Sequence, residues 1–144
     1  SFQIFGKGRL CMQKTIRRRK FQPHDGVFTR LMPLPIHGVG VFVILPIRKG
    51  TNVFAHDNSK IVWVEERRLK RLPKAAWKLY EDFGVFKDGR YGCPPSFNQL
   101  TPAWYVNSSS NPNLYCDENY DFIAARDIKA GEELTINYST YSEE

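Results

Sequence analysis

The apolar residues of this chain come in short segments that Gly, Pro and Asn residues interrupt every few positions. The longest segment covers residues 39–46 and contains Gly40. A membrane-spanning helix needs about 18 apolar residues, so this segment is too short for one. Short apolar segments bounded by turn residues are typical of β-strands. The predicted strands cover residues 27–34, 41–45, 51–55, 60–64, 120–125 and 134–138.

A helical pattern occurs in residues 65–84. Its apolar positions recur at helical spacing and are Leu69, Leu72, Ala76, Leu79, Tyr80 and Phe83. Pro73 predicts a break, followed by a second helix that ends near Phe83 with Gly84 as its cap. Residues 89–102 and 107–113 are rich in turn residues and are expected to be irregular. Many short strands with one helical insert predict a mostly β (β-rich α+β) domain of several small sheets.

The net charge of +6 is unevenly distributed. Residues 1–30 contain eight Lys/Arg and one Asp, whereas residues 31–144 contain 13 Lys/Arg and 14 Asp/Glu. We therefore expect a basic, flexible arm at residues 1–24 and a near-neutral domain at residues 25–144. The run Arg17, Arg18, Arg19 and Lys20 could contact nucleic acid, although such runs are more often solvated tails. Residues 117–144 carry eight acids and two bases, which favours a basic protein partner.

The three cysteines, Cys11, Cys93 and Cys116, are scattered and contain no CxxC pair. This spacing indicates neither a zinc cluster nor a disulfide framework, so we expect no metal site. The first residues contain no apolar segment of the kind found in signal peptides. We therefore expect an intracellular protein, in the nucleus or cytoplasm, rather than a secreted or membrane protein.

Three short motifs are weak when taken singly. The pair Gly38 and Gly40 could form only a tight hairpin, residues 107–113 only an Asx-type turn, and residues 131–134 only a charged turn. Their order and spacing carry more information. The series His37-Gly38-Val39-Gly40, Tyr105-Val106-Asn107-Ser108 and Gly131-Glu132-Glu133-Leu134-Thr135-x-x-Tyr138 resembles the SET domain of protein lysine methyltransferases over residues 25–141.

The resemblance implies a SET-domain β-clip of small antiparallel sheets, with a C-terminal pseudoknot and a helical insert at about residues 65–84. It implies S-adenosylmethionine as cofactor and Tyr138 as the catalytic tyrosine. Tyr105 would line the lysine channel, although packing in the core is an equal alternative. The residues implied for cofactor binding are Gly38, Val39, Gly40, Asn107, Ser108 and Tyr141. The backbone of the glycine pair and the Asn107 side chain would bind the amino acid end of the cofactor. The Ser108 backbone and the Tyr141 ring would contact its adenine.

The sequence also departs from the family pattern. Ser108 stands where the family usually has His, Asn137 precedes the tyrosine in place of Asp, and no cysteine cluster flanks the domain. The expected function is a protein lysine N-methyltransferase that acts on a basic protein such as a histone. The alternative is a catalytically inactive SET-fold module that binds peptide or nucleic acid.

Overall fold

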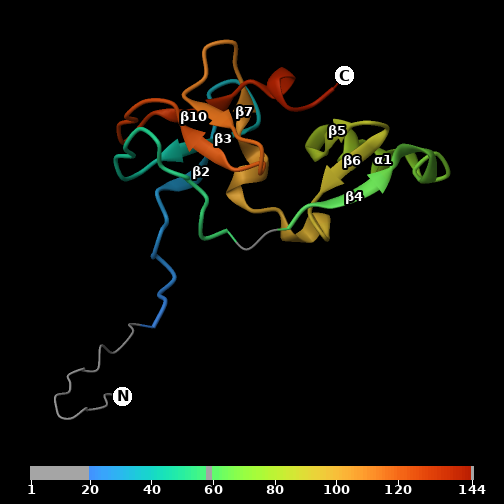
Figure 1. The fold of residues 1–144 in the computed structure, drawn as a ribbon, viewed down its shortest axis with the longest axis horizontal. Helices are drawn as coiled ribbons and strands as arrows, with labels where there is room; N and C mark the ends of the chain where they lie inside the picture. The colour runs from blue at the N-terminus through green and yellow to red at the C-terminus, as the bar shows by residue number, and fades with distance from the viewer. Residues whose placement is uncertain (1–19, 58–59, 144) are drawn as a thin grey trace, which may run out of the picture.

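A computed structural model describes residues 20–57 and 60–143. These residues form three small sheets and one α-helix, so the predicted fold class is confirmed (Figure 1). The main sheet has the order β2 (Thr29–Pro33), β3 (Val39–Val43), β10 (Glu133–Ile136) and β7 (Asn107–Ser108). The second has the order β4 (Val62–Glu65), β6 (Arg90–Cys93) and β5 (Val85–Lys87), and the third pairs β8 (Leu114–Cys116) with β9 (Phe122–Ala124). No helix in the described ranges is long and apolar enough to cross a bilayer.

The hairpin of β2 and β3 turns at Gly38, whose φ of 78° is in the left-handed region that glycine tolerates. The predicted strand at residues 41–45 is partly wrong. Strand β3 ends at Val43, and Ile44 and Leu45 are 44% and 54% exposed. Pro46 follows them and has no backbone N–H to donate to a strand partner, so the strand cannot continue regularly through it.

Strand β10 lies between two segments that are distant in sequence. It pairs antiparallel with β3 and parallel with β7, with Thr135 opposite Asn107. Leu134 and Ile136 alternate inward and are fully buried, which matches the period of a strand. They share the main core with Val41, Val43, Ile47, Val53, Val106, Leu114, Ala124 and Ile128.

The Asn113 side chain joins the 107–113 loop to β10. Its Nδ2 donates to the Glu133 carbonyl oxygen over 2.9 Å, and its Oδ1 accepts from the Thr135 N–H over 2.9 Å. Asn113 is only 4% exposed, so these groups have little access to water. The amide therefore replaces two backbone hydrogen bonds where the loop meets the C-terminal strand.

The insert between the two halves of the main sheet consists of β4, β5 and β6 with the 3₁₀ turn η1 (Glu66–Arg68) and the helix α1 (Lys74–Phe83). The predicted break at Pro73, the helix end at Phe83 and the Gly84 cap are confirmed. Residues 69–72 form a turn rather than a first helix. Leu79, one of the apolar positions of the predicted helical pattern, is 38% exposed. Trp77, which was not part of that pattern, packs on the insert core of Leu69, Tyr91 and Cys93.

Further local predictions are wrong or incomplete. Strand β6 occupies Arg90–Cys93, which was expected to be a loop. Gly92 lies under Trp63, where an added Cβ would be 2.9 Å from the indole ring. This glycine therefore makes room for a neighbouring side chain and does not form a turn. Strands β5 and β8 were not predicted, and β7 begins the segment 107–113 that was expected to be irregular, because Asn107 and Ser108 pair with β10. The expected strand at residues 51–55 is a turn in which Asn52 makes one bridge to Ile123.

The C-terminal segment lies along the free edge of β5. The Glu143 N–H donates to the Phe86 carbonyl over 2.7 Å, and the Ser142 Oγ accepts from the Phe86 N–H over 3.0 Å. These bonds connect the insert to the segment that follows β10. At the other end of the chain, the Phe21 ring packs 5.6 Å from His56. Arg17, Arg18, Arg19 and Cys11 lie outside the described residues, so the predicted arm is described only from Lys20.

Candidate active site

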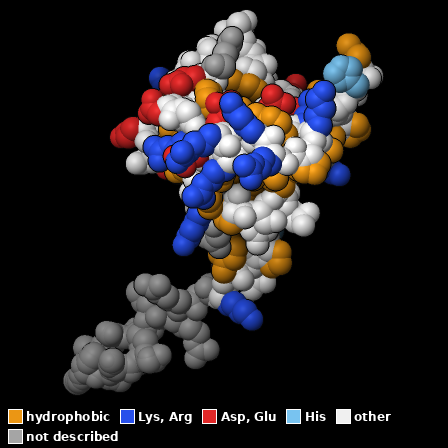
Figure 2. Space-filling model, turned by 90° about the vertical axis from the view of Figure 1, so that its right-hand side faces the viewer, with side chains coloured by type: hydrophobic (Ala, Val, Ile, Leu, Met, Phe, Trp, Pro, Cys, Tyr) orange, Lys and Arg blue, Asp and Glu red, His pale blue; other side chains and the backbone are white. Residues whose placement is uncertain are grey.

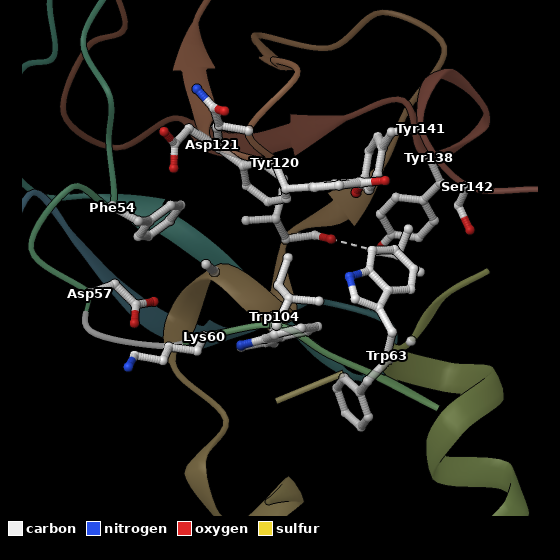
Figure 3. Close-up of a pocket in the computed structure, with 18 of the residues that line it drawn as sticks. Phe54, Asp57, Lys60, Trp63, Trp104, Tyr120, Asp121, Tyr138, Tyr141 and Ser142 are labelled. Atoms are coloured by element: carbon white, nitrogen blue, oxygen red, sulfur yellow. Dashed lines mark hydrogen bonds between the residues drawn. The ribbon is translucent and has the colours of Figure 1, made fainter. Parts of the chain in front are cut away.

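A cleft of about 590 Å³ opens between the main sheet and the insert. Aromatic side chains converge on it from both sides (Figure 3). Phe54, Trp104, Tyr138 and Tyr141 come from the main body, and Trp63 comes from β4 of the insert. An aromatic lining excludes water and suits the apolar stem of a long side chain such as lysine.

The charged residues of the cleft are mostly acidic. Asp57, Glu81, Asp82 and Asp121 line it together with one cation, Lys60. A cleft with an excess of negative charge attracts cationic groups and raises their local concentration. The lining therefore favours a basic ligand.

Tyr138 lies on the wall of this cleft and begins the 3₁₀ turn η4 (Tyr138–Thr140), which follows β10 after Asn137. Its hydroxyl donates a hydrogen bond to the Val106 carbonyl oxygen (Figure 3), and its ring packs edge-on 6.3 Å from Tyr141. Tyr138 is 42% exposed, and partial burial raises the pKa of its phenol above the ordinary value, so the hydroxyl stays protonated at neutral pH. The O–H group is used as the donor to the Val106 carbonyl. The lone pairs of the Tyr138 oxygen therefore remain available to accept a hydrogen bond in the cleft.

The Asn107 amide is held by the two other motifs. Its Nδ2 donates to the Val39 carbonyl over 3.0 Å and to the Glu133 Oε2 over 2.9 Å. With both N–H groups engaged, the amide can offer only its Oδ1 to a ligand, as an acceptor. A Cβ on Gly40 would lie 2.7 Å from the Glu133 Oε2, so a larger residue at this position would force that carboxylate to shift. The role of Glu133 was not predicted from the sequence, where it resembles a residue of a charged turn.

Gly38 and Ser108 complete this side of the site. A Cβ on Gly38 would meet no atom within 4 Å, so the backbone there borders open space. The Ser108 Oγ accepts from the Tyr138 N–H over 3.1 Å, a side-chain contact that was not expected. Val106 lines the cleft, and the next residue, Asn107, bonds to Val39 instead. Val106 is 2% exposed in the main core, and residues 106 and 107 connect the cleft wall, through the Val106 carbonyl, to the hairpin that carries the glycine pair, through the Asn107 amide.

Tyr141 and Tyr105 lie in different surroundings. Tyr141 lines the cleft, its ring lies 5.9 Å from Phe122, and burial raises its pKa. Tyr105 is not part of the lining. It packs against the main core and edge-on to Phe83 at 5.5 Å, which is the alternative that the sequence left open. Functional roles for both tyrosines stay predictions. Trp63 and Trp104 were missed, because a tryptophan in the sequence is equally typical of a core.

Two comparisons with known proteins bear on this arrangement. The family model for the SET domain matches residues 38–139. A crystal structure from Plasmodium falciparum, described as a "putative histone methyltransferase", is similar at 18% identity, covering 78% of this chain and 93% of that chain with a TM-score of 0.49. The matched residues include the glycine pair, Asn107, Glu133 and Tyr138, the groups that the structure brings together, and this chain belongs to the SET-domain family.

Proposed function

We propose that this protein is an S-adenosylmethionine-dependent protein lysine N-methyltransferase that acts on a basic protein such as a histone. The observation that carries the proposal is the position of the Tyr138 hydroxyl. It lies on the wall of an aromatic cleft and bonds to the carbonyl of Val106, the residue before Asn107, whose amide donates to Val39 and Glu133. Family membership supports a methyltransferase of the SET type.

The residues around Asn107 fit the amino acid end of S-adenosylmethionine. The free Oδ1 of Asn107 can accept from an ammonium group, and the open space at Gly38 leaves room for a ligand against the backbone. When bound, this cofactor supplies an electrophilic methyl group on a sulfonium. The glycine pair, Asn107 and Ser108 would hold it, as the family resemblance predicts.

The aromatic cleft suits the reacting amine. Lysine must be neutral to act as a nucleophile, and neutralising it at pH 7 costs roughly 4.6 kcal/mol from its ordinary pKa of about 10.4. Orientation of bound reactants can supply about 7–11 kcal/mol, so positioning is the larger effect. Burial among Trp63, Trp104 and Tyr138 also disfavours the charged form of the amine. The Tyr138 oxygen would accept a hydrogen bond from the amine and orient its lone pair.

The acidic lining supports a basic substrate. Asp57, Glu81, Asp82 and Asp121 would attract a segment rich in Lys and Arg before the target lysine enters. Residues 117–143 contribute to the same negative charge. This is why we favour a histone or another basic protein over a neutral one.

Replacing Asn107 by Ala should weaken S-adenosylmethionine binding by about 10- to 100-fold, because a hydrogen bond to a charged group contributes about 1.5–3 kcal/mol. Isothermal titration calorimetry measures the change. Methylthioadenosine, which lacks the amino acid end, is the control ligand and should bind both proteins equally. Equal losses for the two ligands would indicate a general distortion and contradict the assigned contact.

A methyl-transfer screen tests the function itself. The purified chain is incubated with radiolabelled S-adenosylmethionine and either core histones or cell-lysate proteins, and mass spectrometry locates the modified residue. We expect label on a lysine of a basic protein. If S-adenosylmethionine neither stabilises the protein against heat nor labels any protein, the catalytically inactive alternative is correct.

A further inference from the structure

The insert carries a concentrated group of cations that the sequence analysis did not single out. Between Arg67 and Lys78 there are six Lys/Arg and no Asp/Glu. All six are exposed, and we call them the insert basic surface: Arg67, Arg68, Lys70, Arg71, Lys74 and Lys78. The other described residues carry nine Lys/Arg and fourteen Asp/Glu. The near-neutral domain is therefore divided into a basic insert surface and an acidic remainder.

The fold directs these cations outward. Leu69 is 3% exposed, and Leu72 and Trp77 pack with it on the insert core. The basic residues alternate with these anchors along η1, the turn that follows it and the start of α1. Figure 2 looks onto the side of the molecule where the insert lies in Figure 1 and shows Lys and Arg side chains gathered across its centre.

Ion pairs within the chain engage only part of this charge. Arg67 and Arg68 lie 3.2 and 3.7 Å from Glu65, and Lys78 lies 3.1 Å from Asp82. In the described ranges Lys70, Arg71 and Lys74 make no salt bridge. Lys74 is also the first residue of α1, where the helix dipole disfavours a cation. These three cations therefore add no stabilising ion pair, and Lys74 lies four residues before Lys78 on α1, a like-charge spacing that is destabilising.

The composition of the surface favours a phosphate backbone over an acidic protein. No large apolar side chain is exposed between Arg67 and Lys78, and the adjacent Leu79 is only 38% exposed, whereas protein interfaces need clusters of apolar or aromatic anchors. Duplex nucleic acid carries one charge per about 1.7 Å and is bound mainly through exposed Lys and Arg.

We propose that the insert basic surface binds the phosphate backbone of a nucleic acid. The helix α1 contributes Lys74 and Lys78 to this surface and Glu81 and Asp82 to the cleft. One consequence rests on the proposed function: a basic protein that is already bound to nucleic acid would fit both surfaces. The phosphates of the nucleic acid would contact the insert basic surface, and the lysine-rich segment of the protein would enter the cleft.

Fluorescence anisotropy with the full chain tests the binding directly, without any methyl-transfer readout. The probes are a labelled duplex DNA and a structured RNA, each titrated over a series of salt concentrations. The test variant is Lys70→Gln/Arg71→Gln/Lys74→Gln. We expect its affinity to fall about tenfold or more at low salt, and the slope of log K against log salt to fall by about two to three units, since each lost phosphate contact removes about 0.9.

Two matched variants separate position from net charge. Arg48→Gln/Lys49→Gln/Lys129→Gln removes the same charge from exposed positions outside the insert and should change affinity by no more than about twofold. Arg17→Gln/Arg18→Gln/Arg19→Gln measures the contribution of the N-terminal arm. Circular dichroism melting confirms that each variant is folded.

Four outcomes would overturn the proposal. The first is no salt-dependent binding of either nucleic acid, and the second is the same loss of affinity for the insert variant as for the charge-matched variant. The third is a loss of affinity in the arm variant with none in the insert variant, and the fourth is binding of polyglutamate in place of nucleic acid. Binding of DNA alone or RNA alone would support it and identify the nucleic acid. Because binding is measured without cofactor, its failure leaves the proposed methyl transfer unaffected.

Discussion

A Tyr138→Phe variant should transfer methyl groups about 100-fold more slowly, or worse, while binding S-adenosylmethionine nearly as well as the parent. The ring and its contact with Tyr141 would remain, but the oxygen that we expect to orient the amine would be gone. Misplacement of a reacting group by about 1 Å can cost about 100-fold in rate. The measurements are kcat with labelled methyl donor and the Kd of the donor by calorimetry.

The control for this variant is Tyr115→Phe, which also removes one phenolic hydroxyl. Tyr115 lies in β8 and is 51% exposed, so its variant should retain full activity. Losing the Tyr138 bond to Val106 should itself lower the free energy of unfolding by only about 1 kcal/mol, and a melting curve checks this. Parental activity in the Tyr138 variant would remove the tyrosine from the mechanism.

An Asn113→Ala variant should lose about 2–4 kcal/mol of unfolding free energy. The substitution leaves the Thr135 N–H and the Glu133 carbonyl without their side-chain partner at a position that is 4% exposed. An unsatisfied buried polar group costs about 1–3 kcal/mol, and two are created here. Urea denaturation followed by circular dichroism measures the loss.

Asn111→Ala is the matched control for Asn113. It changes the same residue type in the same loop, but Asn111 is exposed, so we expect a change within about 0.5 kcal/mol. If both variants were equally stable, the Asn113 amide would not be what joins the loop to β10. An Asn113→Asp variant should also be destabilised, because its carboxylate can accept from Thr135 but cannot donate to Glu133.

The parts of the fold that depend on neighbouring residues could be predicted from the sequence. The β2 segment, the end of α1 at Phe83 and the strand at residues 134–136 follow from apolar periodicity and turn residues. Strands β5 and β6 could not be predicted, because Gly92 in β6 suggests a turn unless Trp63 is known to lie over it. The end of β3 at Val43 was missed because the apolar run continues through Leu45.

The sequence by itself determined which residue types were available for the site: a glycine pair, an amide, a carboxylate and a tyrosine at family spacing. Only the tertiary structure decided that Asn107 donates to Val39, 68 residues away, and to Glu133, and that the Tyr138 hydroxyl reaches Val106. It also decided that six cations of the insert share a surface while acids line the cleft. The physical reason is that periodicity reports which side of an element is buried, whereas partners across sheets are chosen by packing and by hydrogen bonding between distant segments.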